Sequence, residues 1–221
     1  MLFTVQDVLQ SVGATIDQDT TLPEGTELLT RVQFCQRAQL DWFEFYNWQE
    51  LRRPFAPTVL ASMTSIGLPQ NFVRLASPVY DYSGGIDSPF EYQELNSPSD
   101  RFRKLSTDKF VYVAGDDSSG RSLQIRPALA SGVSLNFEYQ CMPSSLASIN
   151  NTITCPSLQF MAKRVSYYIL QARSDSRFQI VQAESDTLLG QLLERQDTPT
   201  GGQNNRVPNW MSRQSFRPGR D

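Results

Sequence analysis

The spacing of apolar residues changes twice along this 221-residue chain, and that change restricts the fold more than any other feature of the sequence. Near the N-terminus, and again from Pro156, apolar side chains recur every three or four residues, as on one face of a helix. From about residue 58 to residue 142 the apolar residues are mostly β-branched or aromatic, which favours strands. The sequence therefore predicts an α+β fold with helices at both ends and strands between them.

Two helices are expected in the first part of the chain. Thr4 is a good N-cap because Asp7 follows three residues later, and this helix should end near Gly13, before a turn-rich stretch. A longer helix should begin at Thr26 and end before Pro54. Its expected stripe is Leu29, Val32, Cys35 or Gln36, Gln39 or Leu40, and Phe43. The helix leads into the aromatic cluster Trp42, Phe43, Phe45, Tyr46 and Trp48.

Strands separated by turn signals are expected in the middle of the chain. The expected strands are Val73–Tyr82, Phe110–Val113, Leu123–Arg126 and Val133–Tyr139, with a short helix at Pro98–Leu105. The run from Gly115 to Gly120 resembles a metal or phosphate loop only faintly, because it lacks the Lys of a P-loop and the ligand spacing of an EF-hand. We interpret it as a hairpin turn. Two further helices are expected near Leu158–Ala172 and Phe178–Arg195.

The composition excludes several kinds of functional site. The chain has no His, which removes Ser-His and Cys-His catalysis and every His-containing zinc site. Its three Cys form no CxxC pair, so we expect three reduced thiols in a cytosolic protein. Nucleotide-binding and hydrolase motifs are also missing. We therefore expect no enzymatic activity, no catalytic residue, no metal ion and no cofactor.

Nothing in the sequence indicates a membrane partner. No stretch approaches the roughly 20 apolar residues of a membrane span. The first residues lack the basic and apolar regions of a signal peptide.

The charge is segregated along the chain. Residues 198–221 carry four Arg and one Asp, a balance of +3, whereas residues 1–197 carry 16 basic and 22 acidic residues, a balance of −6. Large side chains spaced among Arg are typical of partner-binding segments. The candidate docking residues of this basic tail are Arg206, Val207, Trp210, Met211, Arg213, Phe216, Arg217 and Arg220.

A role in DNA binding is the alternative for this tail. The net charge of the tail is only +3, whereas specific duplex binding needs many contacts with phosphates. Arg side chains also pair with acidic grooves on proteins. We favour a protein partner and leave open whether the tail touches DNA as well.

Several short motifs follow one another in an order that resembles a known family. They are the aromatic stretch Trp42–Leu51, the Leu-Pro-x-x-Phe element Leu68–Phe72, the strands Leu123–Pro127 and Leu135–Tyr139, and the closing helical segment Val165–Leu170. This layout resembles the head–tail connector proteins (adaptor or tail-tubular type) of tailed bacteriophages. The resemblance covers most of residues 1–195.

The resemblance implies a bundle built from the N- and C-terminal helices, with an inserted antiparallel β-rich domain that is sandwich- or barrel-like, and an extended C-terminal tail. The corresponding boundaries are 1–57 and 143–196 for the two parts of the bundle, 58–142 for the β-rich domain and 197–221 for the tail. It implies a structural protein that forms a ring of about twelve copies under the portal. Such a ring extends the DNA channel and carries the tail or nozzle.

The partners implied by the resemblance are further copies of the chain, the portal protein, the tail or nozzle protein and, transiently and without specificity, the genomic DNA. The expected location is the head–tail junction of the virion, and the host cytoplasm during assembly. Another neck or tail component, such as a stopper or tail-completion protein, remains an alternative. A DNA-binding assembly factor is a further one.

Overall fold

The computed structural model describes residues 2–85, 87–105, 107–116, 120–130 and 133–196, and it shows an α+β protein. Its contacts divide the chain into two compact units. The first, here called the helical unit, joins the segment up to Glu50 to the segment from Pro143 onward. The second, the β unit, is Leu51–Met142. The boundary predicted from the sequence lies between residues 57 and 58, whereas the contacts divide the chain between Glu50 and Leu51.

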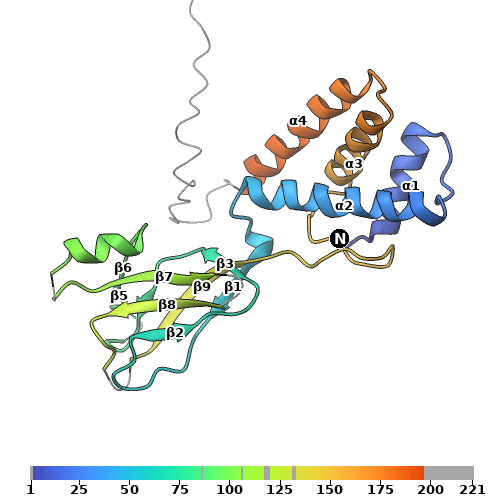
Figure 1. The fold of residues 1–221 in the computed structure, drawn as a ribbon. Helices are drawn as coiled ribbons and strands as arrows, with labels where there is room; N and C mark the ends of the chain where they lie inside the picture. Colours follow the sequence, from blue (N-terminus) through green and yellow to red (C-terminus); the bar gives the residue numbers. More distant parts are fainter. Residues whose placement is uncertain (1, 86, 106, 117–119, 131–132, 197–221) are drawn as a thin grey trace, which may run out of the picture. The chain divides into compact units, whose positions relative to one another are not determined.

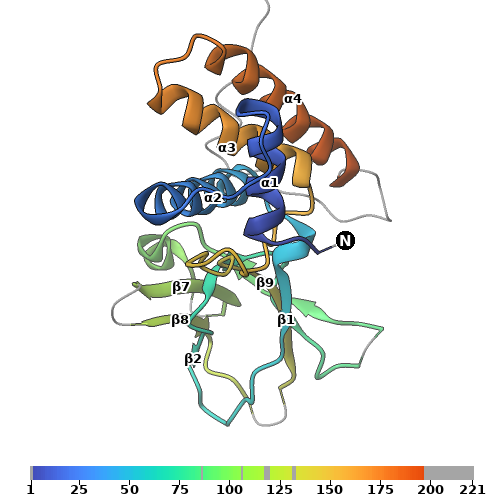
Figure 2. The same ribbon diagram turned by 90° about the vertical axis from the view of Figure 1, so that its right-hand side faces the viewer.

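Helix α3 is the centre of the helical unit. Within the described residues this unit contains the helices α1 (Val5–Ile16), α2 (Gly25–Phe45), α3 (Leu158–Ala172) and α4 (Phe178–Gln196). α3 contacts each of the other three helices, so segments from both ends of the sequence lie side by side (Figure 1, Figure 2). A helix is present in each of the four predicted ranges, and α2 ends at Phe45, earlier than the expected end before Pro54.

Local capping explains where two helices begin. Thr4 caps α1 through a complete capping box, in which its side chain accepts from Asp7 N and the Asp7 side chain accepts from Thr4 N. Ser157 caps α3 by accepting from Phe160 N at 3.1 Å. These contacts satisfy backbone donors that have no partner within the helix.

The predicted end of α1 at Gly13 is wrong, because the helix continues to Ile16. Gly13 is buried inside the helix, and the Asp19 carbonyl oxygen would lie 2.3 Å from a Cβ at this position. The residue is therefore glycine because the returning backbone approaches it closely, rather than because the helix stops there.

The predicted stripe of α2 is confirmed except at its first residue. Val32, Cys35, Gln39 and Phe43 are buried. Leu29 is 61% exposed and therefore lies outside the buried stripe.

Two sheets make up the β unit. The first contains β1 (Arg52–Phe55), β9 (Leu135–Cys141), β4 (Tyr80–Asp81) and β5 (Phe90–Glu91) in this order, and β3 (Phe72–Leu75) also pairs with β9. The second has the order β2 (Ser65–Gly67), β8 (Gly120–Arg126), β7 (Phe110–Asp116) and β6 (Gln93–Glu94). All pairs are antiparallel except β6 with β7. Among the described residues neither sheet closes into a barrel.

Both sheets contribute to one hydrophobic core. Ile66, Val111 and Ile125 come from the second sheet, and Leu135 and Phe137 come from β9 of the first. The alternation predicted for residues 134–139 explains this packing, since every second side chain of β9 faces the core.

The single strand predicted at Val73–Tyr82 is wrong, because β3 and β4 are separate. Both pair with β9, β3 near its end and β4 near its start. Between them Ala76 N and Ser77 N both donate to the Glu138 carbonyl, and Pro78 has no N–H to donate. A continuous ladder therefore cannot form across this stretch.

We predict that Leu123→Ala lowers the free energy of unfolding by about 2–5 kcal/mol, because Leu123 is fully buried between the sheets. Leu60→Ala in the same unit should change it by less than about 0.5 kcal/mol, since Leu60 is 65% exposed. Urea unfolding followed by circular dichroism measures both. Equal losses in the two variants would contradict this assignment of the core.

Candidate functional site

The eight docking residues predicted for the basic tail, Arg206 to Arg220, lie outside the residues that the structure describes. The described part of the chain offers titratable clusters, a pocket and an uneven distribution of charge as candidate sites.

A cluster around Asp41 connects three helices. Asp41 on α2 accepts from Arg164 Nε of α3 at 2.7 Å and from the Tyr168 hydroxyl on the same helix. Arg164 also donates to Asp186 of α4 at 3.1 Å. Burial, and then the hydrogen bond to the Asp41 carboxylate, raise the pKa of Tyr168 to about 12. At neutral pH this cluster holds fixed charges and a neutral phenol, which stabilises the helical packing.

A second ionic cluster connects α1, α2 and α3 at the other end of α2. Arg31, only 5% exposed, pairs with Asp17 at 3.0 Å and with Glu27 at 2.6 Å. Arg173 pairs with the same Asp17 at 2.8 Å. The hydrogen bond from Arg173 is the main reason why the pKa of Asp17 lies below its usual value. Each cluster pairs arginines with carboxylates from different elements, which is the arrangement of a structural network.

The three thiols are free and buried. Burial raises the pKa of Cys35 to about 12, and burial also raises the pKa of Cys155 to about 12. A thiol reacts as its thiolate, so these two side chains are poor nucleophiles and act as small apolar residues. The expectation of reduced thiols agrees with this state.

The two tryptophans of the aromatic cluster, at and just after the end of α2, belong to the core of the helical unit. Trp42 and Trp48 are fully buried and stack at 5.0 Å between ring centroids. Trp48 Nε1 donates to the Trp42 carbonyl at 2.6 Å, which fixes the chain as it leaves the helix. These rings are therefore unavailable for stacking on a base or a sugar.

The acidic run at 115–120 lies between paired strands. β7 and β8 are antiparallel, and Asp116 is in register with Gly120, as the predicted hairpin requires. Within the described ranges, no group of three or more Cys, Asp or Glu side chains is placed to hold a metal ion. None of the helices in that part of the chain is both long enough and apolar enough to cross a membrane.

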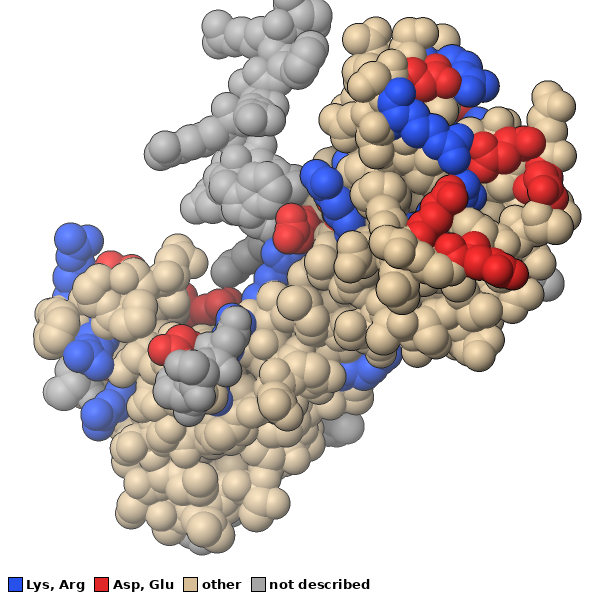
Figure 3. Space-filling view, turned by 45° about the vertical axis from the view of Figure 1, so that its right-hand side comes forward, with Lys and Arg blue, Asp and Glu red and all other residues tan. Residues whose placement is uncertain are grey.

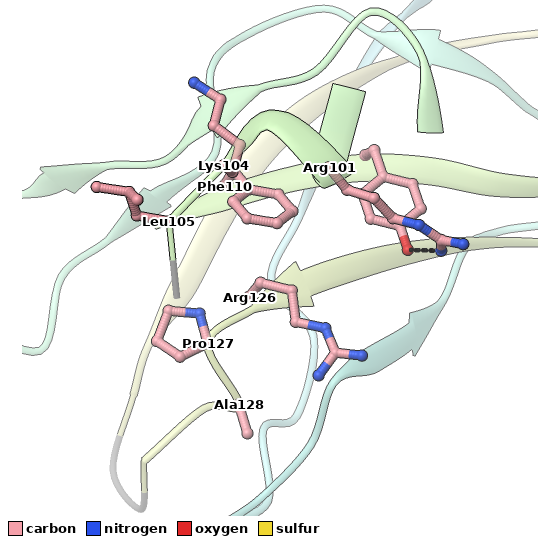
Figure 4. A pocket seen from close by; sticks show the side chains of 8 residues that line it. Arg101, Lys104, Leu105, Phe110, Arg126, Pro127 and Ala128 are labelled. Atoms are coloured by element: carbon pink, nitrogen blue, oxygen red, sulfur yellow. Dashed lines mark hydrogen bonds between the residues drawn. The ribbon is translucent and has the colours of Figure 1, made fainter. Parts of the chain in front are cut away.

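A basic pocket lies on the outer face of β7 in the β unit (Figure 4). The 3₁₀ helix η2 (Pro98–Arg103) covers one side of it, and the end of β8 forms the other. Its cavity measures about 570 Å³. The residues that line it are Arg101, Lys104, Leu105, Phe110, Tyr112, Arg126, Pro127 and Ala128.

The floor of this pocket is a small apolar layer. Phe110 and Tyr112 form it together with Leu95, since side chains alternate along β7 and the intervening Val111 faces the main core. Sequence reasoning missed this pocket. The available signal was the pair Arg101 and Lys104 within one short helical turn, together with Arg126 at a strand end.

Charge divides between the two units. The β unit, residues 51–142, carries nine basic and nine acidic residues and is neutral. Residues 1–50 and 143–196 carry 7 basic and 12 acidic residues, a balance of −5, so the acidic character predicted for the body belongs to the helical unit. Figure 3 shows basic side chains near one edge of the β unit and a broad area without charge beside them.

Two uncharged segments of the β unit lie side by side. Residues 54–73 and 127–137 contain no charged side chain. They are joined where Ser62 N donates to the Leu129 carbonyl and Leu129 N donates to the Met63 carbonyl, both at 2.8 Å. Leu60 in the first segment is 65% exposed. This part of the β unit therefore offers an uncharged surface to its surroundings.

We predict that the Tyr168 hydroxyl stabilises the protein up to high pH. Because the pKa of Tyr168 is raised in the folded protein, its hydroxyl contributes its full stabilisation below pH 10. This stabilisation is lost as the pH rises toward about 12. Tyr168→Phe should therefore lose about 1–3 kcal/mol of stability at pH 8 and show a smaller further loss between pH 10 and 12. Urea unfolding across this range measures it, and unchanged stability at pH 8 would contradict the role of the Asp41 contact.

The buried thiols give a second measurement. In the native protein at pH 8, Cys35 and Cys155 should react with a disulfide reagent far more slowly than in denaturant, where all three thiols become accessible. Rapid reaction of both in the folded state would show that the helical unit opens readily.

Comparisons with known proteins name no family for this chain. No protein-family model matches the sequence, and no curated protein matches it. Function is therefore argued from the fold, the charge and the surfaces described above.

Proposed function

We propose that this protein is a structural head–tail connector of the adaptor type in a tailed bacteriophage. It forms a ring of about twelve copies under the portal, extends the DNA channel and provides the platform to which the tail or nozzle attaches. It acts by assembly and has no enzymatic role.

The observation that carries this proposal is the discontinuous helical unit. Helices from both ends of the chain contact one another, and the β-rich unit lies between them in sequence. This is the order that the resemblance to connector proteins implies, namely a helical bundle with an inserted sandwich-like β domain. It keeps the first and last described segments in one unit, so the tail that follows Gln196 starts from the bundle.

The basic tail is the portal-docking segment of the proposal. Ordering a free segment costs about 1–2 kcal/mol per residue of backbone entropy, whereas burying Trp210 or Phe216 returns about 1.5–3 kcal/mol each. Charge-assisted contacts from the four Arg of the tail add to this. One tail therefore binds weakly, and a ring of tails binds strongly through effective concentration.

The acidic balance of the helical unit suits a channel that DNA must pass. Like charges repel, so an acidic surface near phosphate prevents DNA from adhering during passage. The observation that favours the second candidate, a stopper or tail-completion protein, is the pair of uncharged segments in the β unit, which would offer an uncharged surface to a neighbouring tail component.

Mixing the full chain with the assembled portal of the same phage tests the proposal. Light scattering should find a complex heavier than the portal by about twelve copies of 25.0 kDa. A chain truncated after Gln196 should keep the circular dichroism of the body and fail to join the portal. As a matched control, Trp210→Ala with Phe216→Ala should weaken joining, while Gln203→Ala with Gln214→Ala should leave it intact.

Two outcomes would overturn parts of this proposal. If the full chain stays monomeric beside the portal but joins purified tails, it is a distal component rather than an adaptor. If the truncated chain joins the portal as well as the full chain does, the docking role of the tail is wrong.

A further inference from the structure

We propose that the pocket between η2 and the end of β8 is a binding site for phosphate groups of the DNA backbone. That the phosphate groups belong to DNA rests on the proposed function. That the pocket binds phosphate groups rests on the residues that line it.

The pocket brings cations together without carboxylates. Arg101, Lys104 and Arg126 line it, and none of its lining residues is acidic. Within the described residues none of these three forms an ion pair with a carboxylate. The neighbouring Asp108 is engaged by the backbone, since its Oδ2 accepts from Leu105 N at 3.0 Å. Like charges held together in this way favour an anionic ligand.

The two arginines are the centre of the proposed site. In Figure 4 the guanidinium groups of Arg101 and Arg126 extend to the same side of the pocket, and Lys104 extends to the other side. Lys104 Nζ donates to Gln93 Oε1 at 2.6 Å, so it forms the rim of the site. Arg101 donates a hydrogen bond to the Tyr112 hydroxyl at 3.0 Å, and its Cζ lies 4.8 Å from the centroid of the Phe102 ring. These two contacts hold the guanidinium group in place. A guanidinium group held in place loses less entropy when it binds.

The hydrogen-bonding character of the pocket selects the ligand. Arg101 and Arg126 present donors only, and the Tyr112 hydroxyl accepts from Arg101, which leaves its own proton to donate. A phosphodiester offers two charged acceptor oxygens that match the planar fork of a guanidinium group. Phe102 and Leu105, 78% and 72% exposed, stand beside the cations and give apolar contact to the sugar edge of a strand.

A modest affinity follows from the number of contacts. Two or three neutralised phosphates give a slope of log K against log salt of about −2 to −3, far less steep than that of a repressor. Such a site holds DNA loosely, and the contact is lost and remade as DNA moves.

The test measures binding of the full chain to a fluorescent duplex by anisotropy, at roughly 20 to 200 mM salt. The variant is Arg101→Gln with Arg126→Gln. The matched control is Arg103→Gln, which removes an exposed cation of η2 that does not line the pocket. The basic tail is present in every protein, so differences between them report on the pocket. A second arm replaces the duplex with inorganic phosphate at constant ionic strength and reads the melting temperature.

We expect the double variant to bind the duplex about tenfold more weakly at low salt and to lose about two from the magnitude of the salt slope. Arg103→Gln should change the slope by well under one. Equal effects of both variants would overturn the pocket as the site, since charge in general would then explain the binding. Stabilisation by inorganic phosphate alone, with unchanged duplex binding, would overturn DNA as the source.

The portal mixing experiment separates this proposal from the proposed function. The double variant should join the portal as the unaltered chain does. If it loses the portal and keeps its DNA affinity, the pocket is a protein contact and the phosphate proposal is wrong. The unaltered chain could fail to join a portal while the double variant still shows the expected fall in the slope of log K against log salt. The phosphate site would then stand and the connector function would be wrong.

Discussion

The buried side chain of Gln39 joins α2 to the segment that returns from the β unit. It is fully buried on α2, its Nε2 donates to the Ser144 carbonyl at 2.9 Å, and its Oε1 accepts from Thr154 N at 2.8 Å. One turn earlier, Gln36 accepts from Leu146 N at 2.7 Å. A buried amide without these partners would cost about 1–3 kcal/mol for each unsatisfied group. The helical unit therefore reaches its stable form only when the segment that follows β9 is in place against α2.

This dependence explains why the ionisable side chains of the helical unit are structural. Asp41 and Asp17 each receive an Arg from α3, a helix that follows the β unit in sequence. Pairs of this kind align helices from distant parts of the chain, and they leave the remaining acidic side chains exposed to set the surface charge. Stabilisation within the helical unit and the proposed repulsion of phosphate by its surface thus use different members of the same set of acids.

The helices were predictable because their signals are local. Thr4 with Asp7, and the apolar period of residues 158–172, specify helices without knowledge of the rest of the fold. The break between β3 and β4 depends on the contacts of Ser77 with Glu138, which are distant in sequence. The basic pocket is of the same kind, because Arg101 and Arg126 meet only through the pairing of β7 with β8. The connector function and the docking tail stay predictions of the sequence.

Weak contacts become useful when one geometry repeats them. A single tail with two aromatic anchors, or a single pocket with two arginines, binds too loosely to act alone. In the proposed ring each contact would raise the effective concentration of the next, so the tails together would attach firmly to the portal. Pockets with few phosphate contacts would each release moving DNA quickly. The small number of cations in each pocket suits the proposed passage for DNA, since a strongly basic surface would hold the genome in place.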